Sequence, residues 1–328
     1  DDFQDVPAVW NGTTVWRDYR NGNYDIYRYD SSLVAPVPVC TATGEQYGPK
    51  VSDDHIVWRD ARGVSFDIYG YDRATATEFP ICTDPAAQHG PDLYERYVVW
   101  HDDRNGNSDI YAYDLQLDEE FPVCVADGVQ RYPAVWGDVF VWLDYRTNPG
   151  GDIWYWDASV GGPPWPLVMG SGDKSWIDIC QEWVVWGERS LTTDWDIKAY
   201  NLSTDVTRTI YSGPGIQQNP SIDGDWLVFE NIQSGEPDIE FYDIINGTFH
   251  DTWTDLNLSF EPDIQSGAIV NRQGTAGGAE IAVGGPSWAH DTQEVWGSTR
   301  YQTAAAIALA AFPQGADTVL IATGENFP

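Results

Sequence analysis

The chain has 328 residues, of which 51 are acidic and 17 are basic, and its formal net charge is −34. Such an acidic surface repels nucleic acid and anionic membranes, so the sequence predicts neither as a partner. No apolar run reaches the roughly 18 residues of a membrane-spanning helix, which predicts no membrane insertion. The start at Asp1, without a signal peptide, predicts a mature or trimmed product.

A repeat of about 42 residues recurs seven times along the chain. Its first copy contains Val15-Trp16-Arg17-Asp18, followed by Asp25-Ile26-Tyr27. The copies weaken toward the C-terminus, where Val270-Asn271 replaces the Val-Trp pair. A fixed period of this length, dense in short strands and turns, is typical of a β-propeller with one blade per repeat. The sequence therefore predicts an all-β fold, a seven-bladed β-propeller of four-stranded antiparallel blades, over residues 1–296.

The first repeat divides into four expected strands, near residues 7–10, 14–18, 24–30 and 35–40, with alternating apolar side chains. A proline opens the inner strand in six repeats, where a missing N–H does least harm: Pro7, Pro49, Pro91, Pro133, Pro220 and Pro262. The last repeat predicts strands near 262–265, 268–271, 279–283 and 294–296. Cys40, Cys82 and Cys124 are one repeat apart, too far for disulfides, which predicts buried free thiols.

Residues 297–328 differ from the repeats. An Ala-rich run at 305–311 precedes an apolar segment at 318–322. The pattern predicts a helix followed by a strand, that is, a short α/β C-terminal segment forming a separate unit.

The Val-Trp-x-Asp-x-Arg repeats resemble TolB-type propeller repeats of bacterial and archaeal surface proteins, over about residues 7–285. The tail resembles the truncated start of a type-2 cell-wall-binding repeat, through Arg300-Tyr301-Gln302-Thr303-Ala304 and the ending Ala322-Thr323-Gly324-Glu325-Asn326-Phe327-Pro328. The resemblances imply a propeller outside the cytoplasm, at the cell wall or cell surface. They also imply that the complete C-terminal region binds cell-wall polymer. They imply no particular activity.

One end of the predicted ring carries repeated polar residues. Four glutamines lie three residues before the proline that opens the inner strand: Gln46, Gln88, Gln130 and Gln217. They are candidate ligand contacts. Four Asp-Arg pairs lie near the ends of second strands: Asp18/Arg20, Asp60/Arg62, Asp102/Arg104 and Asp144/Arg146. Residues two apart on a strand emerge on the same side, and a ligand seldom needs identical contacts from every repeat. The pairs are therefore interpreted as structural fasteners.

Three acids follow the opening position of the inner strand and could collect a cation near the axis: Asp92, Asp178 and Asp263. Calcium is the one cofactor that the sequence leaves open. Four tryptophans fall outside the position that the repeat gives to Trp, and exposed rings of this kind stack on sugars: Trp165, Trp176, Trp183 and Trp195. Packing in the core is the alternative for these rings.

No nucleophile motif or metal-ligand spacing of histidines is present, and His101, which replaces Arg17 and Arg59 of other repeats, is expected to be a surface variant. The sequence favours a non-catalytic extracellular module that binds protein or glycan. Two alternatives stay open. One is a polysaccharide lyase or hydrolase with its site at the channel mouth. The other is a structural subunit that assembles with copies of itself into a lattice or filament.

Overall fold

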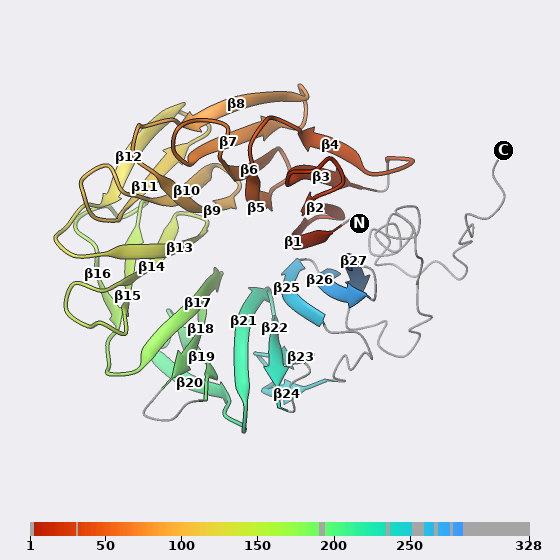
Figure 1. Cartoon of the computed structure of the whole chain (residues 1–328). Helices are drawn as coiled ribbons and strands as arrows, with labels where there is room; N and C mark the ends of the chain where they lie inside the picture. The colour runs from red at the N-terminus through yellow and green to blue at the C-terminus, as the bar shows by residue number, and fades with distance from the viewer. Residues whose placement is uncertain are drawn as a thin grey trace.

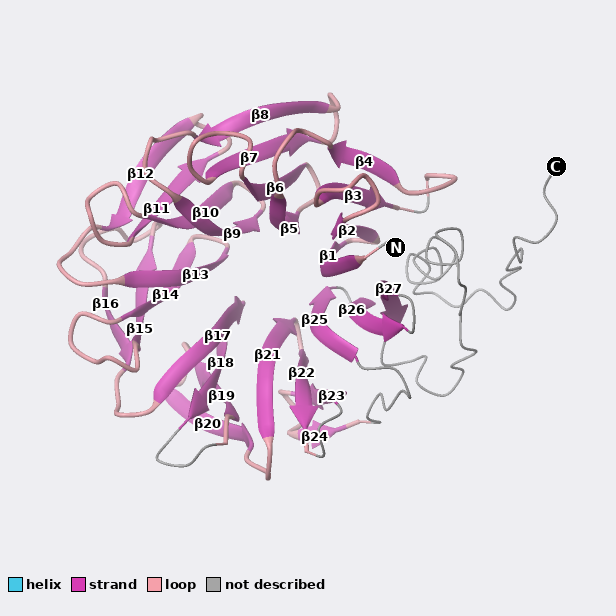
Figure 2. Cartoon of the chain, in the orientation of Figure 1, coloured by secondary structure: helices cyan, strands magenta, loops and turns pink. Residues whose placement is uncertain are grey.

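The structure is a computed structural model that describes residues 3–30, 32–189, 194–233, 237–250, 259–265, 268–275 and 278–284. These residues form antiparallel sheets arranged in a ring around a central axis (Figure 1). Strands and loops make up this part of the chain, and Figure 2 shows no helix in it. A helix able to cross a membrane is accordingly not found among the described residues.

Each sheet is built from strands consecutive in the sequence, with the first strand nearest the axis (Figure 1). Blades 1 and 2 consist of β1 (Gln4–Trp10), β2 (Thr13–Asp18), β3 (Asp25–Tyr29), β4 (Val37–Cys40), β5 (Gln46–Val51), β6 (His55–Asp60), β7 (Asp67–Asp72) and β8 (Thr77–Cys82). Blades 3 and 4 consist of β9 (Gln88–Tyr94), β10 (Tyr97–Asp102), β11 (Asp109–Asp114), β12 (Glu119–Cys124), β13 (Gln130–Trp136), β14 (Val139–Asp144), β15 (Asp152–Asp157) and β16 (Trp165–Val168). Blades 5 and 6 consist of β17 (Asp173–Cys180), β18 (Trp183–Arg189), β19 (Asp196–Asn201), β20 (Val206–Tyr211), β21 (Ile216–Asp223), β22 (Trp226–Ile232), β23 (Pro237–Asp243) and β24 (Thr248–Phe249).

The seventh repeat forms a three-stranded sheet of β25 (Ser259–Gln265), β26 (Ala268–Thr275) and β27 (Gly278–Gly284). The prediction of a β-propeller with four-stranded antiparallel blades is confirmed, but the count of seven such blades is wrong: the described residues contain six. The expected outer strand near 294–296 and the expected α/β segment at 297–328 lie outside the described residues.

Blade 1 and the three-stranded sheet meet where the ring closes (Figure 1). Three backbone N–H groups of β1 and the turn after it donate to side chains of β25: Val6 to Glu261 (3.2 Å), Val9 to Asp263 (2.8 Å) and Asn11 to Gln265 (2.6 Å). Strand β1 pairs with β2 in its own blade, so no strand of blade 1 is lent to the last sheet.

The Trp of the repeat packs against the preceding blade, as Trp58 does against Val15 and Ile26 of blade 1. Trp16, Trp58, Trp100, Trp142 and Trp186 are all fully buried. In the first four blades the indole N–H donates to the Asp two residues later, as in Trp58 to Asp60 at 2.8 Å. The repeat is therefore a packing motif with a buried carboxylate at its end, which explains why these two residue types recur together.

The cysteines confirm the prediction of buried free thiols. Burial raises the pKa of Cys40, Cys82 and Cys180 to about 12, so these thiols stay protonated at neutral pH.

Candidate functional site: the channel and its mouth

The channel is lined at one level by the residue that follows the opening position of each inner strand. Three of these positions carry carboxylates, and one carries an ammonium group, Lys50. The Lys50 Nζ atom lies 3.5 Å from a carboxylate oxygen of Asp92. Lys50 also interacts electrostatically with Asp178 and Asp263, which belong to other blades across the axis. A single cation thus faces three acids in the channel.

Each acid also joins two neighbouring blades. Backbone N–H groups of the next inner strand donate to these carboxylates at 2.8–2.9 Å: Val135 to Asp92, Ile222 to Asp178 and Val9 to Asp263. Asp263 accepts a second hydrogen bond from the Ser221 hydroxyl at 3.2 Å. The acids therefore hold the ring together while contributing negative charge to the channel.

Burial sets the charge states of the cluster. It raises the pKa of Asp178 to about 7, against the opposing effect of the Lys50 ammonium, and raises the pKa of Asp263 as well. Burial alone would lower the pKa of Lys50, but the carboxylates of Asp92, Asp263 and Asp178 raise it above its ordinary value. Near neutral pH, a change of pH consequently alters the charge of Asp178.

The predicted cation site falls on these same three acids. They surround the Lys50 ammonium, so a calcium ion would have to share the carboxylates with it. Among the described residues no group of three or more His, Cys, Asp or Glu is arranged to hold a metal ion. Calcium binding here stays a prediction.

The pKa of Asp178 gives a pH prediction. The folded value of about 7 lies above the unfolded value near 4, so between these pH values the native state binds more protons. The stability contributed by this group is therefore lost as pH rises from about 4 to about 7. Asp178→Asn keeps an acceptor for the Ile222 N–H and should reduce the fall in melting temperature between pH 5 and pH 8. Calorimetry of both proteins at the two pH values measures this, and parallel curves would contradict it.

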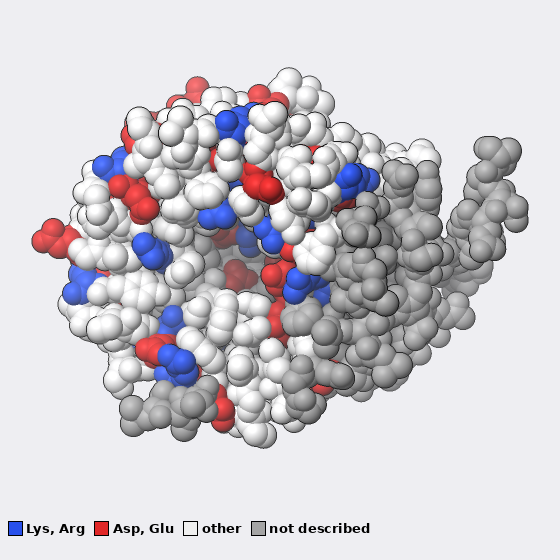
Figure 3. Space-filling model, viewed as in Figure 1, with Lys and Arg blue, Asp and Glu red and all other residues white. Residues whose placement is uncertain are grey.

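A second cluster lies at the channel mouth, the end where second and third strands are joined. Arg59 on β6, His89 on β9, His101 on β10 and Arg131 on β13 form what we call the basic arc. Figure 3 shows the hollow at the centre of the ring, with acidic side chains inside it and basic side chains beside it. The arc comes from blades 2 to 4. Blade 1 carries Arg17 at the position of Arg59, but the Arg17 guanidinium pairs with the Asp5 carboxylate.

Arg59 is held between two aromatic rings. Its guanidinium carbon lies 4.6 Å from the ring centre of Tyr47 and 4.5 Å from that of Phe66. One Nη atom lies 3.2 Å from His89 Nδ1. The buried Nε atom has no hydrogen-bond partner, and no carboxylate is within ion-pair distance, in the part of the chain that the structure describes. Arg59 is therefore a preorganised cation with unused donors.

The two histidines of the basic arc are neutral at pH 7. Their rings stack with centres 5.2 Å apart, and His89 Nε2 lies 3.5 Å from a carboxylate oxygen of Asp103. Burial lowers the pKa of His101 to about 3, and burial with the nearby Arg59 lowers that of His89. His101 is 7% exposed, so the expectation of a surface variant is wrong. The ring fills the space beside Gly90, which has no side chain of its own.

Arg131 ends the arc on blade 4. Its Nε donates to the Ser108 hydroxyl at 3.0 Å, and among the described residues no carboxylate forms an ion pair with it. The neighbouring Tyr132 has half of its surface exposed. Two guanidinium groups without carboxylate partners are unexpected in a chain with a net charge of −34. Their local field favours an anionic group at this end of the channel.

The four predicted tryptophans separate into three places. Trp176 and Trp195 meet at the mouth, edge to face, with ring centres 4.6 Å apart. Trp165 lies on the outer strand β16, where it is exposed and stacks on Tyr155. Trp183 packs in the core between blades 5 and 6, below the surface. Only the first pair shares the channel mouth with the basic arc.

The four predicted glutamines lie at or next to the first residue of an inner strand and are fully buried. Their backbone N–H groups donate to the preceding blade, as in Gln88 to the Phe66 carbonyl at 2.8 Å. The Gln46 side chain donates to the Gly44 carbonyl of the crossover loop at 3.0 Å. The sequence reasoning missed Gln4 in blade 1 and Lys174 in blade 5, which occupy the equivalent position. The side-chain oxygens of all four glutamines have no hydrogen-bond partner among the described residues, and their role as ligand contacts stays a prediction.

The Asp-Arg pairs form a common local structure in four blades. In each pair the Asp is fully buried and accepts from both the backbone N–H and the guanidinium of its Arg. Each Arg lies over the aromatic ring of the third strand. The pairs that share these contacts are Asp18/Arg20, Asp60/Arg62, Asp102/Arg104 and Asp144/Arg146. Their role as structural fasteners stays a prediction.

The prediction that strand alternation brings the Asp and Arg of a pair together is wrong for Asp18 and Arg20. Strand β2 ends at Asp18, and Arg20 lies in the turn beyond it, so alternation along a strand does not bring the two side chains together. The turn itself does so, because the Asp18 carboxylate accepts from the Arg20 backbone N–H at 3.0 Å and from its Nε at 2.8 Å. The Arg20 side chain is only partly buried, and its guanidinium carbon lies 4.1 Å from the ring centre of Tyr27.

In blades 2 to 4 the Arg of the pair also contacts the preceding blade. Arg62, Arg104 and Arg146 each reach the cysteine that ends the preceding blade, as in Arg62 to Cys40 at 3.1 Å. The repeat that precedes Arg20 around the ring is the seventh, and its expected outer strand lies outside the described residues. Among the described residues, three of the four pairs contact a cysteine of the preceding blade.

The ring of blades around a polar channel defines the chain as a β-propeller, and comparison with known proteins agrees at the level of fold. No family model matches the chain, and no curated protein matches it either. TolB from Acinetobacter baumannii superposes with a TM-score of 0.51 and 16% identity, covering 69% of this chain and 58% of TolB.

Two further structures superpose on this chain over a larger share of their own length than TolB does. An oligogalacturonate lyase from Vibrio parahaemolyticus gives a TM-score of 0.66 at 10% identity, covering 86% of this chain and 90% of the lyase. The β-propeller domain of the Trilobed protease from Pyrococcus furiosus gives 0.68 at 13% identity, covering 86% and 92%. At these identities the similarity establishes a TolB-like β-propeller fold and no activity.

Proposed function

We propose that this chain is an extracytoplasmic, non-catalytic propeller that binds a carboxylate-bearing glycan at the channel mouth. The observation that carries the proposal is the basic arc, where Arg59 and Arg131 have no carboxylate partners among the described residues. A planar guanidinium binds a carboxylate through two parallel hydrogen bonds. The Trp176–Trp195 pair at the same mouth offers a stacking surface for a sugar ring.

The location rests on the acidic composition and on the resemblance to TolB-type surface repeats. An extracellular or periplasmic place suits a chain whose charge favours solubility in a salty medium. Attachment to cell-wall polymer would come from the complete C-terminal region, and self-assembly into a lattice remains a separate proposal. Fractionation of the source cells tests the location, and a cytosolic protein would contradict it.

The binding test compares an oligogalacturonate with a neutral glucan oligosaccharide of the same length, by calorimetry at low salt. The wild type should bind the acidic oligosaccharide and should not bind the neutral one. Arg59→Gln should weaken binding roughly tenfold or more, because one charged hydrogen-bond pair is worth about 1.5–3 kcal/mol. Arg96→Gln is the matched control, since Arg96 pairs with Asp114 at the opposite end of the ring. Equal binding of both oligosaccharides would refute the proposal.

An enzyme acting on such a glycan is the second candidate. The non-repeated cluster of His89, His101 and Asp103 beside two guanidinium groups favours it, since neutral imidazoles can accept a proton. The fold neighbours include an oligogalacturonate lyase, which keeps elimination on a uronate in consideration. To distinguish the binder from the enzyme, the protein is incubated with oligogalacturonate and the ultraviolet absorbance of an unsaturated product is measured. New absorbance that His89→Ala abolishes would establish the enzyme.

A further inference from the structure

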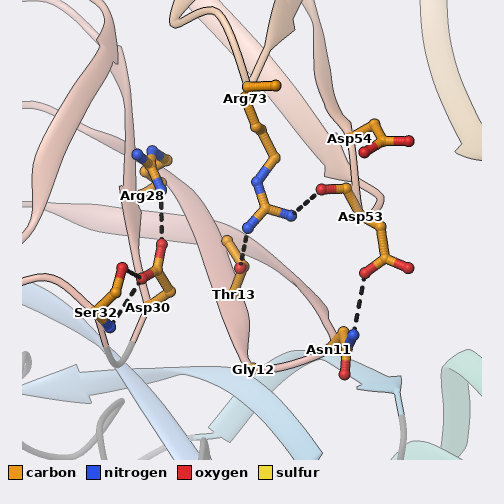
Figure 4. A pocket seen from close by; sticks show the side chains of 10 residues that line it. Asn11, Gly12, Thr13, Arg28, Asp30, Ser32, Asp53, Asp54 and Arg73 are labelled. Atoms are coloured by element: carbon orange, nitrogen blue, oxygen red, sulfur yellow. Dashed lines mark hydrogen bonds and ion pairs between the residues drawn. The ribbon is translucent and has the colours of Figure 1, made fainter.

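A polar cavity of about 500 Å³ lies between blades 1 and 2, at the end of the ring opposite the channel mouth (Figure 4). It is bordered by the turns that join β1 to β2, β5 to β6 and β7 to β8. The charged side chains that line it are Arg28, Arg73, Asp30, Asp53 and Asp54. Its volume falls in the range of small-molecule sites, but its lining contains no aromatic ring.

The two arginines of this cavity replace uncharged residues of the other repeats. Arg28 lies opposite Val15, and the residue in that register elsewhere is Gly70, Ala112, Tyr155, Ala199 or Phe241. Arg73 follows the last residue of β7 and donates its backbone N–H to the preceding hairpin turn. Four other blades make the same bond from Leu115, Ala158, Leu202 and Ile244. Repeats normally share the same packing at equivalent positions. Two neighbouring arginines that depart from this packing therefore indicate a function specific to blades 1 and 2.

The cavity exists because Thr13 has a small side chain. It begins β2, where the equivalent first residue of the second strand is Tyr97, Trp183 or Trp226 in blades 3, 5 and 6. Those aromatic rings fill the gap between blades, and Thr13 leaves it open. The Thr13 hydroxyl instead accepts a hydrogen bond from Arg73 at 2.6 Å. A small residue and two cations thus stand together where blades 3 to 6 pack an aliphatic or aromatic side chain.

The inner part of the cavity is positively charged. Arg73 donates to neutral acceptors, the Ser52 and Asp53 carbonyls at 2.7 and 2.8 Å and the Thr13 hydroxyl. Arg28 pairs with Asp30 at 2.6 Å, and its buried Nε has no partner among the described residues. No carboxylate forms an ion pair with Arg73 among the described residues, although Asp30, Asp53 and Asp54 interact with it electrostatically, so its guanidinium can still bind an anionic group of a ligand.

The rim carries the opposite charge. Asp53 and Asp54 are exposed at the turn between β5 and β6. Asp53 accepts one hydrogen bond, from the Asn11 side chain at 3.1 Å (Figure 4). These carboxylates repel a simple anion approaching the arginines, but they attract a ligand that also carries a cation.

We infer that this cavity binds a small zwitterion, a free α-amino acid, with its carboxylate on Arg28 and Arg73 and its ammonium on Asp53 and Asp54. The paired charges of the ligand match the inner and outer charges of the cavity. The lack of a stacking ring disfavours a sugar here, in contrast with the Trp pair at the mouth. The site is independent of the glycan site proposed above.

The test is a ligand-observed NMR titration of the protein with L-alanine, propionate and ethylamine at low salt. L-alanine should bind, and each of the two singly charged analogues should bind roughly tenfold more weakly or worse. Arg73→Leu, which restores the residue of blades 3 and 5, should weaken L-alanine binding by a similar factor. Arg96→Gln is the matched control, because it removes a guanidinium from the same end of the ring outside the cavity.

Several results would overturn the inference. Propionate binding as tightly as L-alanine would make the cavity a plain anion site. Binding of D-glucose in preference to L-alanine, or no binding of L-alanine at all, would also reject it. If Arg73→Leu fails to fold, Arg28→Ala and Asp54→Asn provide the same test, since the residues found at the Arg28 position in blades 3 and 5 are alanines. Unchanged L-alanine affinity in both of these variants would reject the assignment.

Discussion

Replacing Lys50 with methionine is expected to destabilise the propeller by about 2 kcal/mol at pH 8. Removing one partner of a buried ion pair costs about 3–5 kcal/mol. The Lys50 side chain keeps 42% of its surface exposed within the channel, which reduces the effect through solvent screening. The loss arises because Asp92, Asp178 and Asp263 would face one another without a cation. Thermal or urea unfolding of the two proteins measures the difference.

The pH dependence of this loss identifies its cause. Without Lys50 the folded-state pKa of Asp178 should rise beyond about 7, so its carboxyl stays neutral in the native variant at low pH. The destabilisation should therefore shrink toward pH 5 and grow above pH 7. Adding Asp178→Asn to Lys50→Met should restore part of the stability at pH 8, while Lys50→Arg should cost little. A loss independent of pH would instead indicate a packing defect.

The fold could be predicted from the sequence because each blade is a local structure. Strands within a blade are consecutive, and the Trp and Asp of one repeat pack on each other. The period therefore fixed the strand order without any knowledge of distant contacts. The count of complete blades could not be predicted in the same way. In the last repeat Asn271 replaces the Trp, so the periodic signal is weakest where the outer strand was expected.

The candidate site was predictable only in part, because it depends on contacts between blades. The position of Asp92 and its counterparts near the axis followed from the repeat. Lys50 occupies the same position in blade 2 and could have been found by reading that position through all repeats. The meeting of Arg59 with His89 was not predictable from spacing. It depends on an irregularity in each inner strand beside the opening position, which shifts the register between neighbouring strands.

Exposure was the least predictable property. Trp176 and Trp183 are seven positions apart, yet one lies at the channel mouth and the other in the core. The residue before the inner-strand opening has a positive φ, as in Trp176 (52°) and Tyr132 (55°), and this backbone turn carries the side chain toward the mouth. Sequence alternation alone does not reveal such a turn.

Replacing Arg104 with alanine is expected to destabilise the propeller by about 2–3 kcal/mol, more than an exposed ion pair would contribute. Asp102, its partner, is fully buried, and Arg104 binds it at 2.7 Å. The same guanidinium lies 3.0 Å from Cys82 of the preceding blade and stacks on Tyr111. Alanine would leave Asp102 with the Trp100 indole, one backbone N–H and the Cys82 thiol as donors. The contact of the Arg104 guanidinium with Cys82 of blade 2 would be lost as well.

Acid unfolding distinguishes this fastener from a ligand contact. Burial raises the pKa of Asp102, but the bonds from Arg104 and Trp100 outweigh it and hold that pKa below its ordinary value. Stability from a depressed carboxyl pKa is present above about pH 4 and is lost as pH falls through the folded-state value. The alanine variant should therefore be less stable at pH 7 and approach the wild type near pH 3. Arg104→Lys should fall between the two, because an ammonium keeps the charge and loses the paired geometry. Affinity for the acidic oligosaccharide should not change in either variant, and a loss of binding at an unchanged melting temperature would place Arg104 in the ligand site instead.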